Sequence, residues 1–210
     1  MTMTNEEMEI ISKEPNLFYL RLEDVSQLLS SCREAGIAVE DLMELPVKRQ
    51  REKAAERLLL REAFGRPVNL THTEQGAPMV EGSDMNISIS HTMRLVVLAV
   101  DPAHVIGVDA EQADRQQVIK VRDKFLNANE KQFIAADDLP AHIIAWTAKE
   151  AVIKAERNSA LDWTDGIYLD PFTPDPVKTV LTARCDTRRY SLTSCLLDEH
   201  YITLATPALE

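Results

Sequence analysis

The stretch "IAWTAKEAVIKA", residues 144–155, combines the apolar pattern of a buried helix with three charged side chains, Lys149, Glu150 and Lys154. Glu150 and Lys154 are four residues apart, so they share one face of a helix, whereas Lys149 lies about 100° around it. An exposed ion pair explains this spacing as well as a site in which the carboxylate and the ammonium act together. The segment predicts a helix over 140–158, and both explanations of its charges stay open.

Strand and helix patterns on either side of this helix predict an α+β fold. An early strand at 17–22 precedes a helix at 46–65, which begins near a proline and ends at a glycine, and two strands follow within 86–101. The second half repeats the order of strand, helices and strands. We therefore expect two pseudo-symmetric lobes, residues 1–102 and 103–210, each a small, mostly antiparallel sheet packed with helices, with the active site in the cleft between them. Further helices are expected at 113–128 and 130–137.

Composition and charge are typical of a soluble globular protein. The 210 residues are 45% hydrophobic and 27% charged, and a chain of this length can bury a sizeable core. No apolar run approaches the roughly 18 to 20 residues of a membrane span, and the polar start "MTMTNEEMEI" does not read as a signal peptide. The net charge of -11 argues against nucleic acid as a partner. Cys32, Cys185 and Cys195 have no metal-like spacing, and we expect free thiols in a cytoplasmic protein.

A second charged motif lies in "VIGVDAEQ", residues 105–112. Asp109 and Glu111 are two apart on an expected strand, so both carboxylates point to one face. Their charges repel, and a bound Mg²⁺ would relieve the repulsion, because this ion takes oxygen ligands and shares them with substrate phosphates. For the D-x-E pattern taken alone, a solvated strand end is the commoner explanation.

Polar and basic residues in the first half add candidate anion contacts. Ser90 and His91 end the expected strand "NISISHT". Adjacent side chains on a strand point to opposite faces, so they are no nucleophile–base pair, yet both can donate hydrogen bonds to an anion. The helix described above carries cations every four residues, which neighbouring carboxylates or a bound anion must offset. It therefore presents either a solvated face or a phosphate grip formed by Lys48, Arg51 and Arg57.

The order and spacing of these elements resemble the 4'-phosphopantetheinyl transferase superfamily. The closest resemblance is to its two-lobed members, which activate fatty acid, polyketide and peptide synthases. The family pattern is a G-x-D-x-E element followed at a distance by W-x-x-K-E-x-x-x-K. The matching residues here are Gly107, Asp109 and Glu111 for the first element, and Trp146, Lys149, Glu150 and Lys154 for the second.

The resemblance implies a holo-carrier-protein synthase. Such an enzyme transfers the 4'-phosphopantetheine arm of coenzyme A to a serine of an apo carrier protein and releases 3',5'-ADP. By position, Asp109, Glu111 and Glu150 would hold a magnesium ion on the coenzyme A pyrophosphate. Glu150 would also be the base, Lys154 would bind a phosphate and steady the leaving group, and Glu130 would help the metal site or the base. The other implied coenzyme A contacts are Ser90 and His91 at the phosphates, Lys48, Arg51 and Arg57 at the 3'-phosphate end, and Gly76 and Pro78 at the adenine.

One departure from the family bears on coenzyme A binding. The family commonly has Lys or Arg between the Gly and the Pro of the G-x-P turn, whereas this chain has Ala77, which removes a charge near the nucleotide. The alternatives are a degenerate relative that binds coenzyme A or a carrier protein without transfer, and a scaffold with fortuitous charge pairs. Lys149 is either a second phosphate contact or a solvated neighbour. We expect a monomer whose partners are coenzyme A and an acyl or peptidyl carrier protein, without nucleic acid or membrane.

Overall fold

The first sheet is built around β5 (Leu95–Asp101), in which every residue is buried. In the computed structural model, which describes residues 16–208, β5 lies between β1 (Asn16–Arg21) and β4 (Asn86–His91). Both pairings are antiparallel. A strand flanked on both edges and buried on both faces needs an unbroken apolar run, and "LVVLAV" supplies it.

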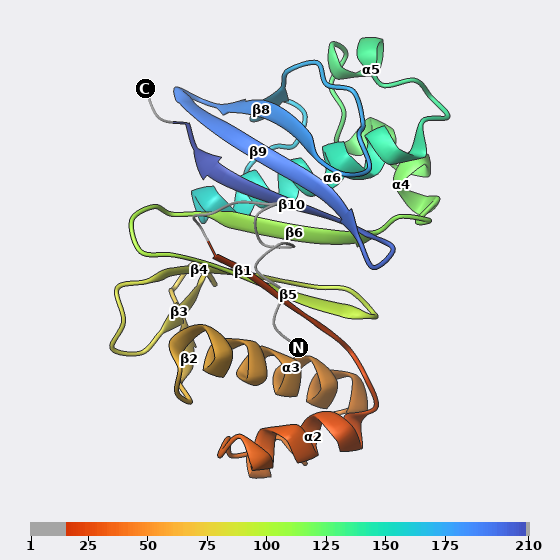
Figure 1. Ribbon diagram of the computed structural model, residues 1–210. Helices are drawn as coiled ribbons and strands as arrows, with labels where there is room; N and C mark the ends of the chain where they lie inside the picture. The colour runs from red at the N-terminus through yellow and green to blue at the C-terminus, as the bar shows by residue number, and fades with distance from the viewer. Residues whose placement is uncertain (1–15, 209–210) are drawn as a thin grey trace.

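Helices cover one face of this sheet in two layers (Figure 1). Helix α3 (Val47–Phe64) packs against β5 and β1, and α2 (Val25–Glu34) packs on α3. Helix α3 follows a proline and ends at a glycine with a φ of 67°, so it confirms the helix expected at 46–65. Three short elements complete this part: the 3-10 helix η1 (Glu40–Leu42) and the hairpin strands β2 (Leu70–His72) and β3 (Pro78–Val80).

The second sheet has five antiparallel strands in the order β6, β10, β9, β8, β7. Their bounds are β6 (Gly107–Gln112), β7 (Ile167–Leu169), β8 (Thr179–Cys185), β9 (Arg188–Leu197) and β10 (His200–Pro207). The sheet curls around α6 (Leu139–Glu156) (Figure 1). The mostly antiparallel sheet expected in the second half of the chain is therefore present.

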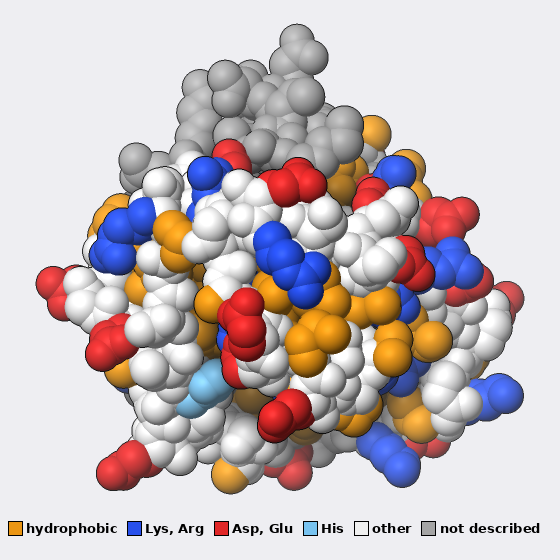
Figure 2. Space-filling view, turned by 90° about the horizontal axis from the view of Figure 1, so that it is seen from below, with side chains coloured by type: hydrophobic (Ala, Val, Ile, Leu, Met, Phe, Trp, Pro, Cys, Tyr) orange, Lys and Arg blue, Asp and Glu red, His pale blue; other side chains and the backbone are white. Residues whose placement is uncertain are grey.

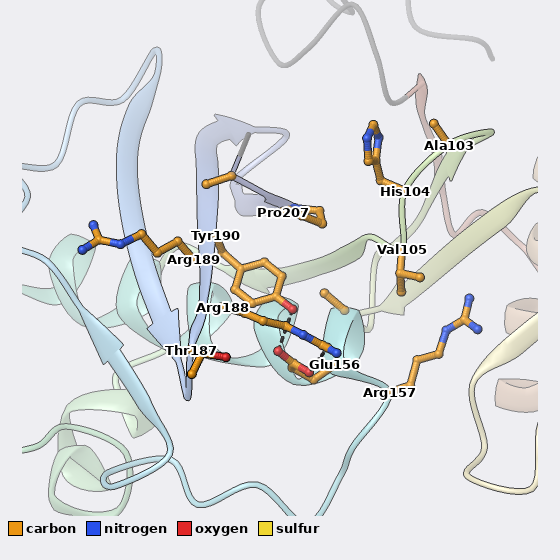
Figure 3. A pocket seen from close by; sticks show the side chains of 12 residues that line it. Ala103, His104, Val105, Glu156, Arg157, Thr187, Arg188, Arg189, Tyr190 and Pro207 are labelled. Carbon is orange, nitrogen blue, oxygen red and sulfur yellow. Dashed lines mark hydrogen bonds and ion pairs between the residues drawn. The ribbon is translucent and has the colours of Figure 1, made fainter. Parts of the chain in front are cut away.

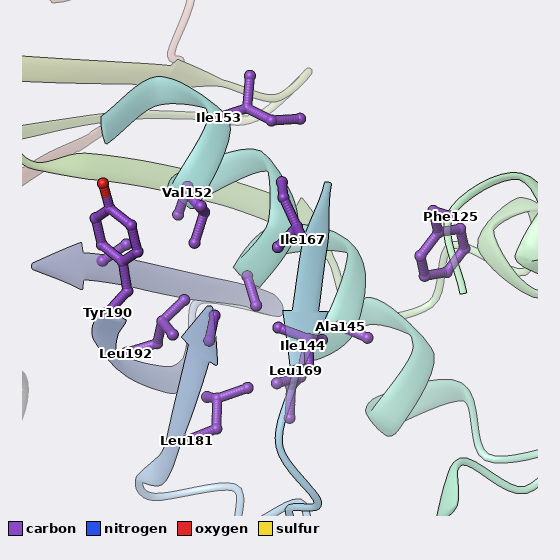
Figure 4. Packing of buried hydrophobic residues seen from close by; sticks show 14 of the residues in the cluster. Phe125, Ile144, Ala145, Val152, Ile153, Ile167, Leu169, Leu181, Tyr190 and Leu192 are labelled. Atoms are coloured by element: carbon purple, nitrogen blue, oxygen red, sulfur yellow. The ribbon is translucent and has the colours of Figure 1, made fainter. Parts of the chain in front are cut away.

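Helix α6 is the centre of the second core. Its N-terminus is capped by Asp138, whose side chain accepts a hydrogen bond from Ala141 N at 3.0 Å. Most of its side chains are buried, and apolar residues from the surrounding strands pack on it, including Ile167 and Leu192 (Figure 4). A helix surrounded in this way must be apolar on nearly every side, which explains why "IAWTAKEAVIKA" lacks a clean polar face.

Gly107 allows α6 to approach β6 at backbone distance. A Cβ atom at this position would lie 1.8 Å from the carbonyl oxygen of Ala151 and 2.8 Å from the backbone nitrogen of Ala155. Both obstacles are backbone atoms of α6, which cannot move without shifting the helix. The glycine of the G-x-D-x-E element therefore sets the distance between the strand that carries Asp109 and the helix that carries Glu150 and Lys154.

Gly107→Ala is expected to lower the free energy of unfolding by about 3 kcal/mol, the upper end of the cost of overpacking a core. The measurement is chemical denaturation of both proteins. Gly82→Ala is the matched control, because Gly82 has a φ of 70° but no atom within 4 Å of the added Cβ. That variant is expected to lose only about 1 kcal/mol from backbone strain. Equal losses in the two variants would contradict the close approach at Gly107.

The structure confirms the α+β class and corrects part of the expected helix content. The segment 113–128 is not one helix, because its turns are short and irregular: α4 (Gln117–Lys120) and η2 (Arg122–Lys124). The next helix, α5 (Glu130–Phe133), begins where expected but ends before residue 137, because Ile134 has an extended backbone with a φ of -99° and a ψ of 104°. The two sheets have three and five strands, so the division into two similar lobes at residue 102 stays a prediction.

The surface on the α2 side mixes charges of both signs. Figure 2 shows Lys and Arg side chains next to Asp and Glu side chains there, with hydrophobic side chains between them. This side of the molecule therefore presents no uniform basic surface. Within residues 16–208, none of the helices combines the length and apolar character needed to cross a membrane.

Candidate active site

The Asp109 carboxylate joins the first sheet, the second sheet and α6. Its Oδ1 atom accepts a hydrogen bond from Ser90 Oγ at 2.7 Å and one from Lys154 Nζ at 2.8 Å. Ser90 belongs to β4 and Lys154 to α6, and the ammonium also donates to Val108 O at 2.8 Å. Asp109 is only 7% exposed and the Lys154 side chain is 28% exposed, so the ion pair is partly shielded from solvent. Its two acceptors hold the ammonium in one place.

The free edge of β6 explains why two serines face it. Val108 N donates to Ser88 Oγ at 2.9 Å, and Ala110 N donates to Ser90 Oγ at 3.2 Å. These hydroxyl oxygens satisfy backbone N–H groups that the edge strand would otherwise leave unpaired. Since Ser90 accepts from Ala110 and donates to Asp109, it orients the carboxylate. The direct phosphate contact that the resemblance implied for Ser90 stays a prediction.

Glu150 lies near enough to the Asp109–Lys154 pair to interact with both charges. Burial raises the pKa of Glu150 above its ordinary value of 4.5, the negative charge of Asp109 raises it further, and Lys154 partly opposes both effects. Two carboxylates that share a partly buried site cannot both ionise without cost. The cluster therefore favours either a proton on Glu150 or a cation beside it.

Glu111 follows Asp109 on the same face of β6 but is held by another partner. It is 8% exposed and forms an ion pair with Arg115. Within residues 16–208, no three His, Cys, Asp or Glu side chains form a ready-made metal site. Asp109 and Glu150 nevertheless fit Mg²⁺, because this ion uses one or two carboxylates and completes its shell with water and substrate phosphates. Glu111 Oε2 accepts from Arg115 and its Oε1 accepts from Gln112 N at 2.9 Å, and the assignment of Glu111 to the metal stays a prediction.

A cavity of about 220 Å³ opens beside this cluster. One wall is the turn at Gly76 to Pro78, in which Gly76 has a φ of 85°, and another is β4 with Ser88. The third wall is the C-terminal end of α6, with Lys154 and Arg157. The structure thus brings the G-A-P turn and Lys154 of the second motif to one cavity, although 78 and 154 are far apart in the sequence.

The basic residues of α3 are not brought to this cavity. Arg51 donates to the carbonyl oxygens of Leu22 and Glu23, and Arg57 donates to Ala38 O at 2.6 Å and to Asp41 Oδ1 at 2.9 Å. These guanidinium groups fix the segment around α2 and η1 against α3. These contacts engage both guanidinium groups within the protein, and the assignment of Arg51 and Arg57 to the 3'-phosphate of coenzyme A stays a prediction.

Lys48 and His91 also have partners that explain them without a ligand. The Lys48 ammonium is exposed and lies 3.9 Å from Glu52. His91 Nε2 lies 2.6 Å from Glu56 Oε1, and Lys53 binds the same carboxylate at 2.6 Å. Burial alone would raise the pKa of Glu56, but its hydrogen bonds with His91 and Lys53 outweigh burial and lower it. His91 therefore couples β4 to α3.

Glu130 and Lys149 form a separate buried ion pair. The Lys149 ammonium donates to Glu130 Oε2 at 2.7 Å, to Trp163 O at 2.6 Å and to Ile167 O at 2.9 Å. Glu130 Oε1 accepts from Leu169 N at 2.9 Å. With 1% exposure for Glu130 and 0% for Lys149, these contacts assign both residues to the core. The catalytic role expected for Glu130 and a phosphate contact of Lys149 stay predictions, and both would require this buried pair to open.

A wider groove lies on the other side of the end of α6 (Figure 3). Within it, Glu156 accepts hydrogen bonds from Arg188 Nη1 and from Tyr190 Oη, each at 2.7 Å. Arg157 lies at the boundary and lines both this groove and the 220 Å³ cavity. None of the residues of the two sequence motifs lines the groove, so we place the candidate site at the smaller cavity.

Comparison with known families agrees with this site. Residues 105–205 match the family model of the 4'-phosphopantetheinyl transferase superfamily. The matched segment contains both sequence motifs, which confirms the resemblance. No curated protein matches the chain. The transfer of phosphopantetheine, with coenzyme A as donor and a carrier protein as acceptor, is the activity that this superfamily implies.

Sequence reasoning missed two residues of the site. Ser88 precedes Ser90 by two positions and so faces the same side of β4, a pattern that "SIS" makes visible once an edge strand is expected opposite. Arg157 stands at the residue after α6, where a helix commonly has glycine. An arginine at a position where glycine is common is the feature of the sequence that could have pointed to Arg157.

Proposed function

We propose that the chain is a magnesium-dependent 4'-phosphopantetheinyl transferase that modifies a serine of an apo carrier protein. The observation that carries the proposal is the meeting of Asp109, Glu150 and Lys154 beside a cavity bounded by the Gly76–Pro78 turn. Two carboxylates and an ammonium next to an open cavity suit the pyrophosphate of coenzyme A.

The reaction needs charge neutralisation and positioning more than covalent catalysis. The serine oxygen forms a bond to the phosphorus that carries the pantetheine arm, and the bond from that phosphorus to the bridging oxygen breaks, which releases 3',5'-ADP. A magnesium ion held by Asp109 and Glu150 would neutralise pyrophosphate charge. Lys154, fixed by Asp109 and Val108 O, is placed to neutralise the charge that develops on the leaving group.

Glu150 is the candidate base for the serine proton. A carboxylate with a raised pKa holds a proton more tightly than an ordinary one and is better matched to proton transfer near neutral pH. Asp109 is already engaged by Ser90 and Lys154, so its oxygen is less free for this role. We therefore assign the proton transfer to Glu150 and the orientation of Lys154 to Asp109.

Glu150→Gln is expected to stabilise the ligand-free protein and abolish transfer. The change removes a negative charge that burial and Asp109 disfavour, so we expect the unfolding temperature at neutral pH to rise by roughly 1–3 °C. The folded state binds the Glu150 proton more tightly than the unfolded state. The advantage of the variant is therefore absent well below pH 4.5 and develops as pH rises through 4.5 toward the raised pKa.

Thermal unfolding across this pH range and a transfer assay are the measurements. Asp137→Asn is the matched control, since Asp137 is exposed and lies in the same half of the chain. It is expected to change neither the unfolding temperature nor activity. A Glu150→Gln protein that transfers the arm at the wild-type rate would remove Glu150 from the mechanism.

Intact-mass spectrometry of apo carrier proteins tests the proposed function directly. Each carrier is incubated with the chain, coenzyme A and Mg²⁺, and the expected result is the mass gain of one phosphopantetheine arm. The gain is expected to disappear with EDTA and when the acceptor serine of the carrier is replaced by alanine. Coenzyme A binding without a gain on fatty acid, polyketide or peptide carriers would instead support a binding protein.

A further inference from the structure

The positively charged guanidinium of Arg157 forms no ion pair with a carboxylate of the described residues. Its Nη2 atom donates to Asn86 Oδ1 at 3.0 Å, a neutral partner on β4. The other cation of the 220 Å³ cavity, Lys154, is paired with Asp109. Because a guanidinium has five N–H groups, the contact with Asn86 orients Arg157 and leaves donors for an anion.

The backbone at Arg157 is unfavourable for an arginine. Its φ of 53° and ψ of 31° lie in the left-handed region, and Arg157 N and Asn158 N close the end of α6 by hydrogen bonds to Lys154 O and Ile153 O. This helix ending favours glycine. A charged residue retained in a strained position at the wall of a cavity indicates a use for the side chain.

The position along α6 indicates which part of coenzyme A meets Arg157. Lys154 and Asp109 mark the proposed place of the pyrophosphate, and the Gly76–Pro78 turn marks that of the adenine. Arg157 is three residues beyond Lys154, about 4.5 Å farther along the helix axis. The ribose, with its 3'-phosphate, connects pyrophosphate and adenine, so it lies at this level of the cavity.

We propose, on the basis of the proposed function, that Arg157 binds the ribose 3'-phosphate of coenzyme A. Ala77 and Arg157 line the same cavity, so Arg157 supplies there the cation that Ala77 does not. Arg51 and Arg57, the other candidates for this phosphate, do not line the cavity, and they donate to carbonyl oxygens and to Asp41 instead. Arg157 thereby selects coenzyme A over its 3'-dephospho form.

Calorimetric titration of Arg157→Gln with coenzyme A and with 3'-dephospho-coenzyme A tests this inference. We expect the substitution to weaken binding of coenzyme A by about tenfold, the scale of one hydrogen bond to a charged group, and to leave binding of the dephospho form within twofold. Arg189→Gln is the matched control, because Arg189 lies in the neighbouring groove and not in the cavity. It is expected to bind both ligands as the wild type does.

Each other outcome overturns a distinct claim. Unchanged coenzyme A binding by Arg157→Gln, with normal binding by the wild type, overturns this inference and leaves the proposed function intact. Equal weakening with both ligands overturns the assignment to the 3'-phosphate. Absence of coenzyme A binding by the wild type overturns the proposed function, and the inference with it.

Arg157→Gly separates ligand binding from structure. Glycine accepts the left-handed backbone without strain, so we expect the unfolding temperature to stay unchanged or rise by about 2 °C while coenzyme A affinity falls as in Arg157→Gln. A lower unfolding temperature with unchanged affinity would show that Arg157 serves only its contact with Asn86. Adding Ala77→Lys to Arg157→Gln is expected to restore part of the affinity for coenzyme A.

Discussion

Lys154→Ala is expected to lower kcat for phosphopantetheine transfer about 1000-fold. Lys154 is held in place before any ligand arrives, because its ammonium donates to Asp109 Oδ1 and Val108 O, each at 2.8 Å. A donor fixed in this way needs no reorganisation when negative charge grows on the leaving group, and removal of one such donor typically costs about 10²- to 10³-fold in kcat. The measurement is steady-state kinetics of holo-carrier formation at saturating Mg²⁺.

Loss of Lys154 is also expected to move the acid limb of the pH–rate profile to higher pH. Lys154 lowers the pKa of Glu150, so its removal leaves burial and Asp109 to raise that pKa further. The base is then protonated at a pH where the wild type is active. Lys178→Ala removes an exposed ammonium from the same half of the chain and is expected to change neither kcat nor the profile. Activity of Lys154→Ala within threefold of the wild type would contradict the site.

The sequence predicts the part of the site that depends on local spacing. The i, i+2 spacing of Asp109 and Glu111 and the i, i+4 spacing of Glu150 and Lys154 survive in any strand and any helix, so their shared faces follow from the sequence alone. The meeting of Asp109 with Lys154 follows from Gly107, whose missing side chain lets α6 lie on β6. The resemblance to the superfamily anticipated this meeting.

The basic residues of α3 show what local spacing does not predict. Their spacing on α3 is as regular as that of the catalytic residues, yet their partners lie in other elements. Arg51 binds carbonyl groups 28 and 29 residues away, and Arg57 binds Asp41, 16 residues away. No pattern within a helix reveals a backbone carbonyl or a carboxylate that arrives from another segment. A row of cations on a helix therefore predicts that acceptors are nearby but not which groups they are. In this protein, groups from other segments of the chain are among the acceptors.

The same limit applies to Glu130 and Lys149, which are 19 residues apart and belong to different helices. Lys149 follows the tryptophan motif directly before Glu150, which makes it look catalytic, but a step of 100° around α6 turns it into the core. There it meets two backbone carbonyl groups and one carboxylate, so all three ammonium protons have acceptors. In this structure the lysine of the motif therefore lies in the core, and its contact with a phosphate stays a prediction.

Lys149→Met is therefore expected to reduce the free energy of unfolding by about 3–5 kcal/mol, the cost of leaving a buried carboxylate without its counterion. Burial lowers the pKa of Lys149, and Glu130 opposes that effect, so the charged form depends on the carboxylate beside it. Denaturant unfolding measures the loss. Lys131→Met is the matched control, since Lys131 pairs with Asp123, whose side chain is 82% exposed, and we expect a change below about 1 kcal/mol.

The double variant Lys149→Met/Glu130→Gln separates the ion pair from the space that its side chains fill. Neutralising Glu130 removes the unpaired charge, so the double variant is expected to be more stable than Lys149→Met alone. Its remaining deficit reports the hydrogen bonds that Lys149 gives to Trp163 O and Ile167 O, which tie the segment after α6 to the core. A Lys149→Met protein that keeps its stability but loses transfer would instead place Lys149 at a phosphate. That result would make Lys149, like Lys154, a residue of the active site, which is one of the two roles that the sequence left open for it.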